Sequence, residues 1–526
     1  MGNASVVLNM RQKKICYLLI CFSLTVLVLP LPLRAQAWVQ VWVQRYNLSV
    51  TNATSAVPVA LTLDINGNPC VAGYVRDGIN YHCVTLKYSA TGAPLWTNRY
   101  EGPDNLGGVP SAIAVDSGGN VFVTGSLSPP LSPVGHPNDY RYLTLAYSGA
   151  GTPLWTNIWF AGGGARAVAI TVGQNGDVFV TGNSAVTTNA YANMTTIAYS
   201  STGAVLWTNR FKGPWSWGSS SASAMALAPD GDVIVAGGYA DAQGYDRAVV
   251  VAYSGTGRPV WTNQYEGPSN FGESLSAVAL DVAGNVFATG SSGDTNGFYD
   301  YLTLGYSSAG VPLWTNRYHP GNFSRASAIA VGTSGNAFVT GLSDPAAGSP
   351  DYSTVAYNAA GAPLWTNRYD GPVHQVDSAT AVAVDFQGNA IVTGASDVSD
   401  TNSDYLTIAY SSAGLPIWTN QYEGTGHGWD NATALALDRA GNLFVTGSSW
   451  NGVRYDFTTI KYANIPRLSI SGLEPSNAVV LSWLNPLFYL QSAPSSSGTF
   501  TNIPGAVSPY TNVSAARQQF FRLISQ

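Results

Sequence analysis

Apolar and polar positions alternate in short runs along most of the chain, and residues 112–157 show one complete unit of the pattern. The segment 112–116 alternates small and β-branched residues, and a Ser-Gly-Gly-Asn turn separates it from the apolar run 121–125. An irregular loop leads to a second alternating run at 142–147, and a Gly-rich turn leads on to 153–157. Runs with a period of two residues, bounded by Gly, Asn and Ser, predict four short β-strands joined by hairpins.

The last strand of this unit carries the sequence Trp-Thr-Asn, which recurs along the chain and is Trp-Val-Gln in the first copy. Successive signature tryptophans are separated by 54, 59, 52, 54, 53, 51 and 53 residues. Self-similarity at about 50 residues indicates a repeat architecture in which each unit buries its apolar face against its neighbours. The signature tryptophans are Trp42, Trp96, Trp155, Trp207, Trp261, Trp314, Trp365 and Trp418.

Four strands in one repeat is the size of a propeller blade, and the order of the strands suggests how the blades form a ring. The array begins with a Trp strand at 39–46 and ends with a third strand at 455–462. If the Trp strand is the outermost of each blade, the last blade lacks its own, and the N-terminal strand supplies it. We therefore predict an all-β fold over 38–463: an eight-bladed β-propeller of four-stranded antiparallel blades, closed by the N-terminal strand. Short apolar runs within 464–526 predict a small C-terminal β-sandwich-like domain.

The repeat D-x-x-G-N-[VAL]-F-[VA]-T-G followed by D-Y-x-T-x-x-Y resembles the bacterial SBBP-type β-propeller repeat. That family is named for seven blades, and the eight copies found here depart from that number. A looser similarity connects the chain with quinoprotein-like eight-bladed propellers, because Thr202-Gly203 is followed by Trp207, four residues after the glycine. This similarity implies that the signature tryptophans wedge between adjacent blades.

The charge of the chain is low and negative. Charged residues make up 10% of the sequence, against about 25% in an average globular domain. Residues 1–37 hold four basic residues and no acidic ones, so the rest has 19 basic and 29 acidic residues and a net charge of −10. Its lysines are Lys87, Lys212 and Lys461. A diffuse negative charge with so few lysines argues against binding to nucleic acid or to an anionic membrane surface.

Residues 1–37 have the pattern of a secretory signal peptide. Three basic residues within 11–14 precede an apolar stretch at 15–33, and Ala-Gln-Ala at 35–37 is a small-x-small cleavage site. A retained membrane anchor is the alternative, but two prolines near the end of the stretch favour cleavage. No second long apolar run follows. We therefore expect a secreted bacterial protein, extracellular or at the cell surface, monomeric and without a membrane span after processing.

Two cysteines remain after that cleavage, Cys70 and Cys83, and they lie on neighbouring predicted strands of the first repeat. Export permits disulfides, so we predict a disulfide between them across the second hairpin of the first blade. Two free buried thiols are the alternative. A metal site is disfavoured because only His82 adds a ligand nearby.

Sequence variation between repeats is confined to the second turns and to the links between repeats. In an up-and-down blade these segments lie on the same face, and loops on a rigid scaffold are where binding sites usually form. Aromatic side chains beside polar ones can stack on sugars or anchor a protein partner. The candidate ligand-binding residues in these loops are Trp429, Trp450, His427, Asp430, Trp215 and Trp217.

The sharpest of these expectations concerns the final repeat. We expect Trp429 and Trp450 to form one exposed aromatic platform, with His427 and Asp430 at its rim. The alternative is that these rings fill gaps between adjacent loops, since large aromatic side chains are usually mostly buried.

Two sets of acidic residues raise the question of calcium. An Asp begins the first turn of most repeats, and we expect it to hydrogen-bond to its own turn rather than to bind metal. Asp397, Asp400 and Asp404 crowd one second turn and are better calcium candidates, although they lack the spacing of an EF-hand loop. No other cofactor is expected.

The sequence contains no His-Glu-x-x-His, no Gly-x-Ser-x-Gly and no phosphate-binding Gly-rich loop with Lys. It therefore favours an exported, non-enzymatic binding scaffold that recognises a glycan or a protein partner through the variable-loop face. The alternative is a secreted enzyme, acting on a polysaccharide or a small molecule, whose funnel active site is assembled from several blades.

Overall fold

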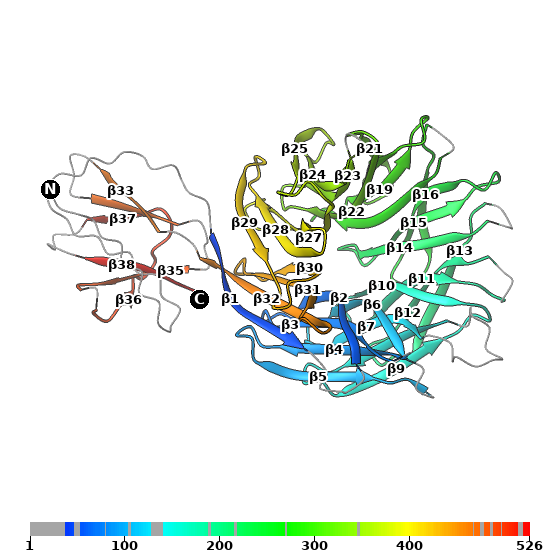
Figure 1. The fold of residues 1–526 in the computed structure, drawn as a ribbon, viewed down its shortest axis with the longest axis horizontal. Coiled ribbons are helices and arrows are strands. Elements are labelled where there is room, and N and C mark those ends of the chain that lie inside the picture. Colours follow the sequence, from blue (N-terminus) through cyan, green and yellow to red (C-terminus); the bar gives the residue numbers. More distant parts are fainter. Residues whose placement is uncertain are drawn as a thin grey trace. The chain divides into compact units, whose positions relative to one another are not determined.

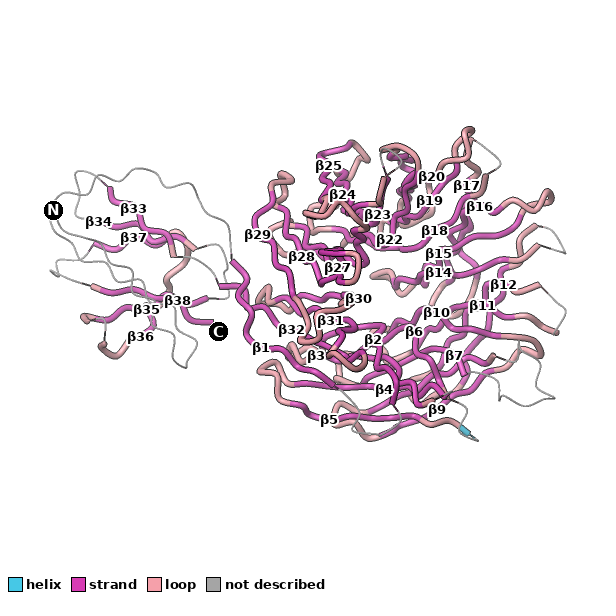
Figure 2. Tube along the Cα trace, viewed as in Figure 1, coloured by secondary structure: helices cyan, strands magenta, loops and turns pink. Residues whose placement is uncertain are grey.

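The computed structural model describes residues 37–46, 53–78, 80–103, 107–127, 140–187, 191–214, 218–268, 271–344, 348–465, 468–473, 478–483, 488–495, 497–513 and 519–525. Over these residues the protein is an all-β fold made of repeated four-stranded sheets, as predicted (Figures 1 and 2). Residues 1–36 of the predicted signal peptide lie outside the described residues, as do Trp215 and Trp217.

The described strands form eight blades, and neighbouring strands within a blade follow one another in the chain, except at the ring closure. Blade 1 contains β2 (Ala53–Leu63), β3 (Pro69–Asp77), β4 (Asn80–Tyr88) and β5 (Pro94–Tyr100). Blade 2 contains β6 (Gly108–Val115), β7 (Val121–Leu127), β8 (Arg141–Tyr147) and β9 (Pro153–Trp159). Blade 3 contains β10 (Ala165–Val172), β11 (Val178–Ser184), β12 (Asn193–Tyr199) and β13 (Val205–Phe211). Blade 4 contains β14 (Ser220–Leu227), β15 (Val233–Ala240), β16 (Asp246–Tyr253) and β17 (Pro259–Tyr265).

The second half of the ring repeats the same order. Blade 5 contains β18 (Glu273–Leu280), β19 (Val286–Gly293), β20 (Tyr299–Tyr306) and β21 (Pro312–Tyr318). Blade 6 contains β22 (Phe323–Val331), β23 (Ala337–Asp344), β24 (Asp351–Tyr357) and β25 (Pro363–Tyr369). Blade 7 contains β26 (Asp377–Val384), β27 (Ala390–Ser399), β28 (Asn402–Tyr410) and β29 (Pro416–Tyr422). Blade 8 contains β30 (Asn431–Leu437), β31 (Leu443–Trp450), β32 (Tyr455–Ile465) and β1 (Ala37–Tyr46).

The N-terminal strand closes the ring, as the order of the repeats predicted. β1 pairs with β32 and so becomes the fourth strand of the last blade. In Figure 1 the colours run from blue through green and yellow to orange, and the orange strands of blade 8 return to the blue ones. A single parallel bridge, Ser55 to Tyr455, also joins β2 to β32. The two ends of the array are therefore held together by backbone pairing.

The core lies between adjacent blades. Second and third strands such as β7 and β8 are buried along almost their whole length, which explains their runs of β-branched and aromatic residues. One cluster joins Phe122 and Tyr142 of blade 2 to Ile170, Val180 and Ile197 of blade 3. Each blade therefore stabilises the next, as expected for a repeat protein.

The Trp-x-Asn signature attaches each blade to the third turn of the following one. Trp96 Nε1 donates to the Gly149 carbonyl at 3.0 Å, and Asn98 Nδ2 donates to the Gly151 carbonyl at 2.7 Å. Gly151 has a φ of 85°, and a Cβ there would lie 2.6 Å from Cγ of Trp96, so glycine is required. The same pair of bonds recurs between the later blades up to blade 7. The rings thus lie between blades, as the quinoprotein similarity implied, with their outer edges partly exposed.

A β-bulge interrupts the pairing of the first and second strands in each blade. A bulge re-aims a side chain, and here it turns hydroxyl groups toward the next blade. Ser276 Oγ donates to the Ala326 carbonyl at 2.6 Å. Thr433 of blade 8 donates to the Pro58 carbonyl of blade 1 at 3.3 Å, across the ring closure.

The first-turn aspartates serve their own turns. Asp64 Oδ1 accepts hydrogen bonds from the N–H groups of Asn66 and Asn68, both at 2.9 Å. Asp281 and Asp385 make the same two contacts in their own turns. The carboxylates are therefore occupied by backbone donors, as expected.

The predicted disulfide is wrong, because Cys70 and Cys83 are both free and buried. β3 and β4 do pair, but their register places Cys70 opposite Lys87 and Cys83 opposite Tyr74. The cysteines are thus offset by four residues along the strand pair, which is about 13 Å at the rise of a β-strand. A disulfide needs Cα atoms within about 7 Å. Both thiols instead pack in the apolar core between blades 1 and 2.

The C-terminal unit consists of two three-stranded sheets. One contains β33 (Ser469–Leu473), β34 (Ala478–Ser482) and β37 (Tyr510–Val513); the other contains β35 (Phe488–Ala493), β36 (Thr501–Asn502) and β38 (Phe520–Ser525). Leu481, Trp483, Leu490 and Phe521 pack into one cluster that both sheets share. The unit therefore has the two-layered form of a small β-sandwich. Among the described residues of the whole chain, no helix is long and apolar enough to cross a membrane.

Candidate functional site

Adjacent blades meet in a constant way at the end that carries the second turns and the links. The N–H at the start of a first strand donates to the carbonyl just before the third strand of the preceding blade, as in Asp377 to Pro350 at 2.8 Å and Ser220 to Ala192 at 2.9 Å. This contact places the first side chain of a third strand beside the first side chain of the next blade. We call this contact a seam and number it by its two blades.

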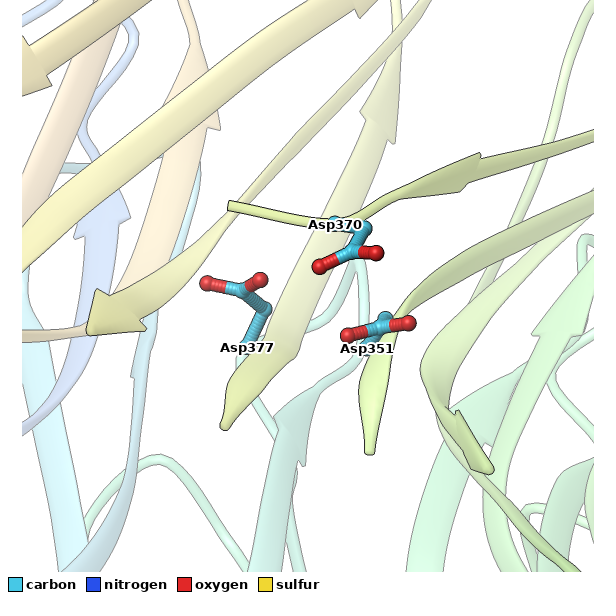
Figure 3. Close-up of side chains that lie close together, drawn as sticks. All are labelled: Asp351, Asp370 and Asp377. Carbon is cyan, nitrogen blue, oxygen red and sulfur yellow. The ribbon is translucent and has the colours of Figure 1, made fainter. Parts of the chain in front are cut away.

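Seam 6–7 gathers three carboxylates. Asp351 begins β24, Asp377 begins β26, and Asp370 directly follows β25. Their carboxylate oxygens lie within 4.8 Å of one another and face each other (Figure 3). Asp351 and Asp377 are 0% exposed, whereas Asp370 is exposed. Three acids from separate segments thus form one group, in which Asp351 and Asp377 are buried and Asp370 reaches the surface.

Two basic side chains border this acidic group. Arg368 forms an ion pair with Asp351 and lies 3.8 Å from an Asp370 oxygen. His374 places Nδ1 2.9 Å from Asp370 Oδ1, and it is held there by a left-handed backbone with a φ of 53°. His374 is exposed. Among the residues that the structure describes, the permanent positive charge at the group is the single guanidinium of Arg368.

Several oxygens of seam 6–7 lack hydrogen bonds. The Gly371 N–H donates to Asp377 Oδ2 at 2.6 Å. The buried Ser396 hydroxyl acts on Asp377 and Tyr369, where its hydrogen bonding opposes the rise of their pKa. Asp351 Oδ1 and Asp377 Oδ1 have no hydrogen bond of normal geometry to any residue that the structure describes. Buried polar atoms usually have a partner, so these atoms require an explanation.

The ionised form of this group is destabilised. Burial, together with Asp370 and Asp377 and against the attraction of Arg368, raises the pKa of Asp351 from 3.8 to about 6. Burial also raises the pKa of Asp377. A carboxyl whose folded pKa exceeds its unfolded one stabilises the fold as the pH falls from about 6 toward 4, because the folded state then binds more protons. At neutral pH a positive charge beside these carboxylates therefore stabilises the group.

Seam 7–8 repeats most of this arrangement. Asp404 lies on β28 beside Asp430, and Glu423 follows β29 as Asp370 follows β25. Burial, then the charges of Glu423 and Asp430, raise the pKa of Asp404 to about 6. His427 has a φ of 49° and places Nδ1 2.5 Å from Glu423 Oε1. The two seams thus share a pattern of acid, Gly, His and Asp, although only seam 6–7 brings three acids within one group among the described residues.

In the two preceding seams, basic side chains pair with the acids. In seam 4–5, Arg247 occupies the position of Asp351 and pairs with Asp241 at 2.8 Å and Glu273 at 3.0 Å. In seam 5–6, Asp300 pairs with Arg317 at 2.8 Å and His319 at 2.5 Å.

The predicted calcium residues do not come together. Asp397, Asp400 and Asp404 form no joint group of ligand atoms, although all three are described. In the β27–β28 hairpin Asp404 pairs with Ser396 and Asp397 pairs with Ser403. Neighbouring positions on a strand point to opposite faces, so Asp397 and Asp404 face apart. The expected site at this turn is therefore wrong.

The aromatic platform of the final repeat is present only in part. Trp429 is 55% exposed. The Trp450 ring packs edge-on against Tyr455 at 5.1 Å between centroids, and it lies under the link, where a Cβ on Gly428 would be 2.5 Å from Trp450 Cδ1. Asp430 is fully buried and accepts a hydrogen bond from the Trp450 N–H at 2.8 Å rather than forming an exposed rim. Trp450 and Asp430 therefore support the loops, whereas Trp429 and His427 are exposed.

A different group of aromatic side chains is exposed around blade 5. Phe271 lies in the link before the blade and is 51% exposed; Phe298 lies in its second turn and Phe323 begins the next blade, both also exposed. Tyr299 joins them, since its hydroxyl donates to the Phe271 carbonyl at 2.9 Å and its ring contacts Phe323 edge-on at 6.2 Å. We call these four residues the blade 5 aromatic group.

Exposed aromatic side chains lie almost entirely on the variable-loop face. In the described part of the propeller, one exposed aromatic residue, Phe386, lies in a first turn. The others lie in second turns or at the links: Phe160, Tyr191, Tyr245, Phe271, Phe298, Phe323 and Trp429. The expectation that variation and binding chemistry share one face is consistent with this distribution.

Sequence reasoning missed the acids of seam 6–7 and the blade 5 aromatic group. A usable signal existed for the first, because the link sequences of 369–377 and 422–430 share an acid, a Gly and a His before the final Asp. The aromatic group had no such signal, since large aromatic side chains are usually mostly buried.

Comparison with known proteins identifies no family for the chain. No family model matches the chain. No curated protein matches it in sequence. Similar solved structures include Sqt1 from Chaetomium thermophilum, with 9% identity over 82% of this chain and 100% of that chain and a TM-score of 0.48. The periplasmic gluconolactonase PpgL from Pseudomonas aeruginosa has 15% identity over 67% and 95% of the two chains, with a TM-score of 0.42. A puromycin hydrolase has 12% identity over 82% of this chain and 59% of its own, with a TM-score of 0.42.

Proposed function

We propose that this protein is an exported, non-enzymatic binding scaffold whose variable-loop face recognises a glycan, with a protein partner as the second candidate ligand. The observation that carries the proposal is the blade 5 aromatic group. Exposed rings held by a rigid frame offer flat apolar surfaces on which sugar rings can stack. Export and a relationship to the SBBP-type repeat proteins belong to the same proposal, and they rest on the sequence of residues 1–37 and on the repeat itself.

The surroundings of the aromatic group suit a neutral polar ligand. Asp294 and Asn296 border Phe298 in the same turn, and the Asp294 side chain accepts hydrogen bonds from the N–H groups of Asn296 and Phe298, both at 2.8 Å. The turn is therefore rigid, and the Asn296 amide adds a donor and an acceptor. Rigid aromatic and amide groups lose little entropy on binding, which favours recognition of a sugar surface.

The alternative, a secreted enzyme, is less well supported. A propeller active site would be assembled from catalytic groups of several blades at an accessible place. The acidic group of seam 6–7 draws on two blades, and Asp351 and Asp377 are both fully buried. A polysaccharide cannot reach these carboxylates, so they do not supply the catalytic pair that a glycosidase needs.

A glycan array with the purified protein tests the proposal. We expect saturable binding to one class of glycan, and we expect the double variant Phe271→Ala/Phe323→Ala to weaken it at least ~10-fold, or about 1.4 kcal/mol. The matched control is Phe386→Ala, because Phe386 is 42% exposed on the opposite set of turns and its loss should leave binding unchanged. Absence of any glycan ligand, or equal losses in both variants, would overturn the proposal and leave a protein partner to be sought by cross-linking.

A further inference from the structure

We propose that Asp351, Asp370 and Asp377 bind a calcium ion in seam 6–7. The three carboxylates come from separate segments and present oxygens within 4.8 Å of one another (Figure 3). The inference goes beyond the proposed function, because the site is formed by two blades and is independent of any ligand on the loop face.

The charge of the seam requires a counterion. Three carboxylates meet there, and the guanidinium of Arg368 supplies a single permanent positive charge next to Asp351. Like charges repel strongly when they are removed from water. A bound divalent cation would balance the two charges that Arg368 leaves uncompensated.

Buried atoms without partners point to a ligand at the same place. Asp351 Oδ1 and Asp377 Oδ1 are buried and make no hydrogen bond of normal geometry to the residues described, and both residues are 0% exposed. A Cβ on Gly371 would lie 3.1 Å from Ser396 Oγ and from both oxygens of Asp377, so the glycine leaves open the space around these atoms. A cation that accepts oxygen ligands would satisfy them together.

The neighbouring seams show how the same positions are neutralised elsewhere. In seam 4–5 the place of Asp351 is taken by Arg247, an attached cation that pairs with Glu273 at the place of Asp377. In seam 5–6 the place of Asp377 is taken by Ser324, and Asp300 is balanced by Arg317. Seams 6–7 and 7–8 both have acids at the two places, and among the described residues seam 6–7 is the one in which three acids form a joint group, so its additional positive charge would come from solution.

The donor set selects the metal. It consists of carboxylate oxygens and one hydroxyl, with no thiol, and the facing nitrogen of His374 is already engaged by Asp370 at 2.9 Å. Hard oxygen donors suit calcium or magnesium rather than zinc or copper. Magnesium demands a near-ideal octahedron and sheds water reluctantly, whereas calcium accepts irregular sets of bidentate carboxylates. An arrangement of two buried acids and one acid at the opening therefore favours calcium.

Calorimetric titration of the calcium-free full chain with CaCl₂ in 0.15 M salt tests the site. We expect saturable binding that is at least tenfold tighter than binding of MgCl₂. We expect Asp377→Asn to abolish one equivalent of bound calcium or to weaken it at least tenfold. Asp370→Asn provides a second variant with an exposed side chain, which is expected to fold normally and to weaken calcium binding severalfold.

Asp300→Asn is the matched control, because Asp300 occupies the position of Asp351 in a seam without a second acid. We expect it to bind calcium like the unaltered protein. The inference fails if the unaltered protein takes up no calcium at 1 mM, or if both seam 6–7 variants bind it unchanged while folded by circular dichroism. Failure of the glycan proposal would leave these measurements untouched.

Discussion

One side-chain position, the first residue that each third strand presents at its seam, carries a different charge in different parts of the ring. In blade order its occupants are His82, Arg141, Asn193, Arg247, Asp300, Asp351, Asp404 and Asp456. The acids thus fall in blades 5 to 8, and the arginines fall in blades 2 and 4. Because the backbone frame is the same in each blade, this difference reflects side-chain chemistry alone. Such a position is where function can vary without any change to the fold.

The register of β3 and β4 leads to a prediction about the cysteines. Burial raises the pKa of both Cys70 and Cys83 to about 12, so neither thiol ionises near neutral pH in the folded protein. In a protein that begins at residue 37, we expect no reaction with a thiol reagent at pH 8 under native conditions and two reactive thiols after unfolding without reductant. Prior reduction is the control. A count of zero in the unfolded, unreduced protein would show that a disulfide had formed.

At the level of elements, the sequence predicts the positions of strands far better than it predicts which residues of neighbouring strands face each other. Eight diverged copies show the same alternation, so the strands, the blades and the closing role of β1 could be inferred without coordinates. Register was not accessible in this way, because adjacency of β3 and β4 does not say which residues face each other. The seam acids were hidden for a related reason: Asp351 and Asp377 are 26 residues apart in the chain, and only the stacking of blades brings them together.

The β-bulges also explain the glycine in the T-G that ends the repeat motif D-x-x-G-N-[VAL]-F-[VA]-T-G. Gly290 lies opposite Leu275, next to the bulge of blade 5. A Cβ on Gly290 would lie 1.9 Å from the Ser274 carbonyl oxygen, so no other residue fits. The Gly is therefore a consequence of the bulge, and the bulge in turn directs a hydroxyl to the next blade.

The bulge hydroxyl can be tested with a matched pair of variants. Ser276→Ala removes the 2.6 Å hydrogen bond to the Ala326 carbonyl and should lower the free energy of unfolding by about 1 kcal/mol. Ser223 lies at the equivalent bulge of blade 4 and makes no side-chain hydrogen bond to the residues that the structure describes, so Ser223→Ala should change stability by less than ~0.5 kcal/mol. Urea unfolding measures both. Equal effects would show that the inter-blade bond contributes nothing.

For the molecule as a whole, the pairing of β1 with β32 turns a row of repeats into a ring. Without β1, blade 8 would lack its outer strand, and the Trp42 Nε1 bond to the Ala90 carbonyl at 3.3 Å would be lost. The contact of Arg45 with Tyr422 at 2.6 Å would go with it. β32 would then expose an unpaired strand edge, and blades 8 and 1 would be joined by contacts such as the Ser55–Tyr455 bridge and the Thr433–Pro58 hydrogen bond without the closing strand.

Two truncations measure the contribution of the closing strand. A protein that begins at residue 37 retains β1, and one that begins at residue 47 lacks it. We expect the shorter protein to melt roughly 10 °C lower or to unfold without a single transition, because several inter-blade contacts are lost together. The longer one serves as the control. Identical melting curves would show that closure does not stabilise the ring.

The closing strand has a consequence for how the protein is made. During synthesis the N-terminal part of a chain is available first, so β1 is complete long before the ribosome reaches β32. It therefore has no pairing strand until the seven blades before blade 8 have been synthesised. A chain released early, at any point before residue 455, therefore cannot form a closed ring, however well its individual blades fold. The closed ring can therefore form only after translation has reached the last blade.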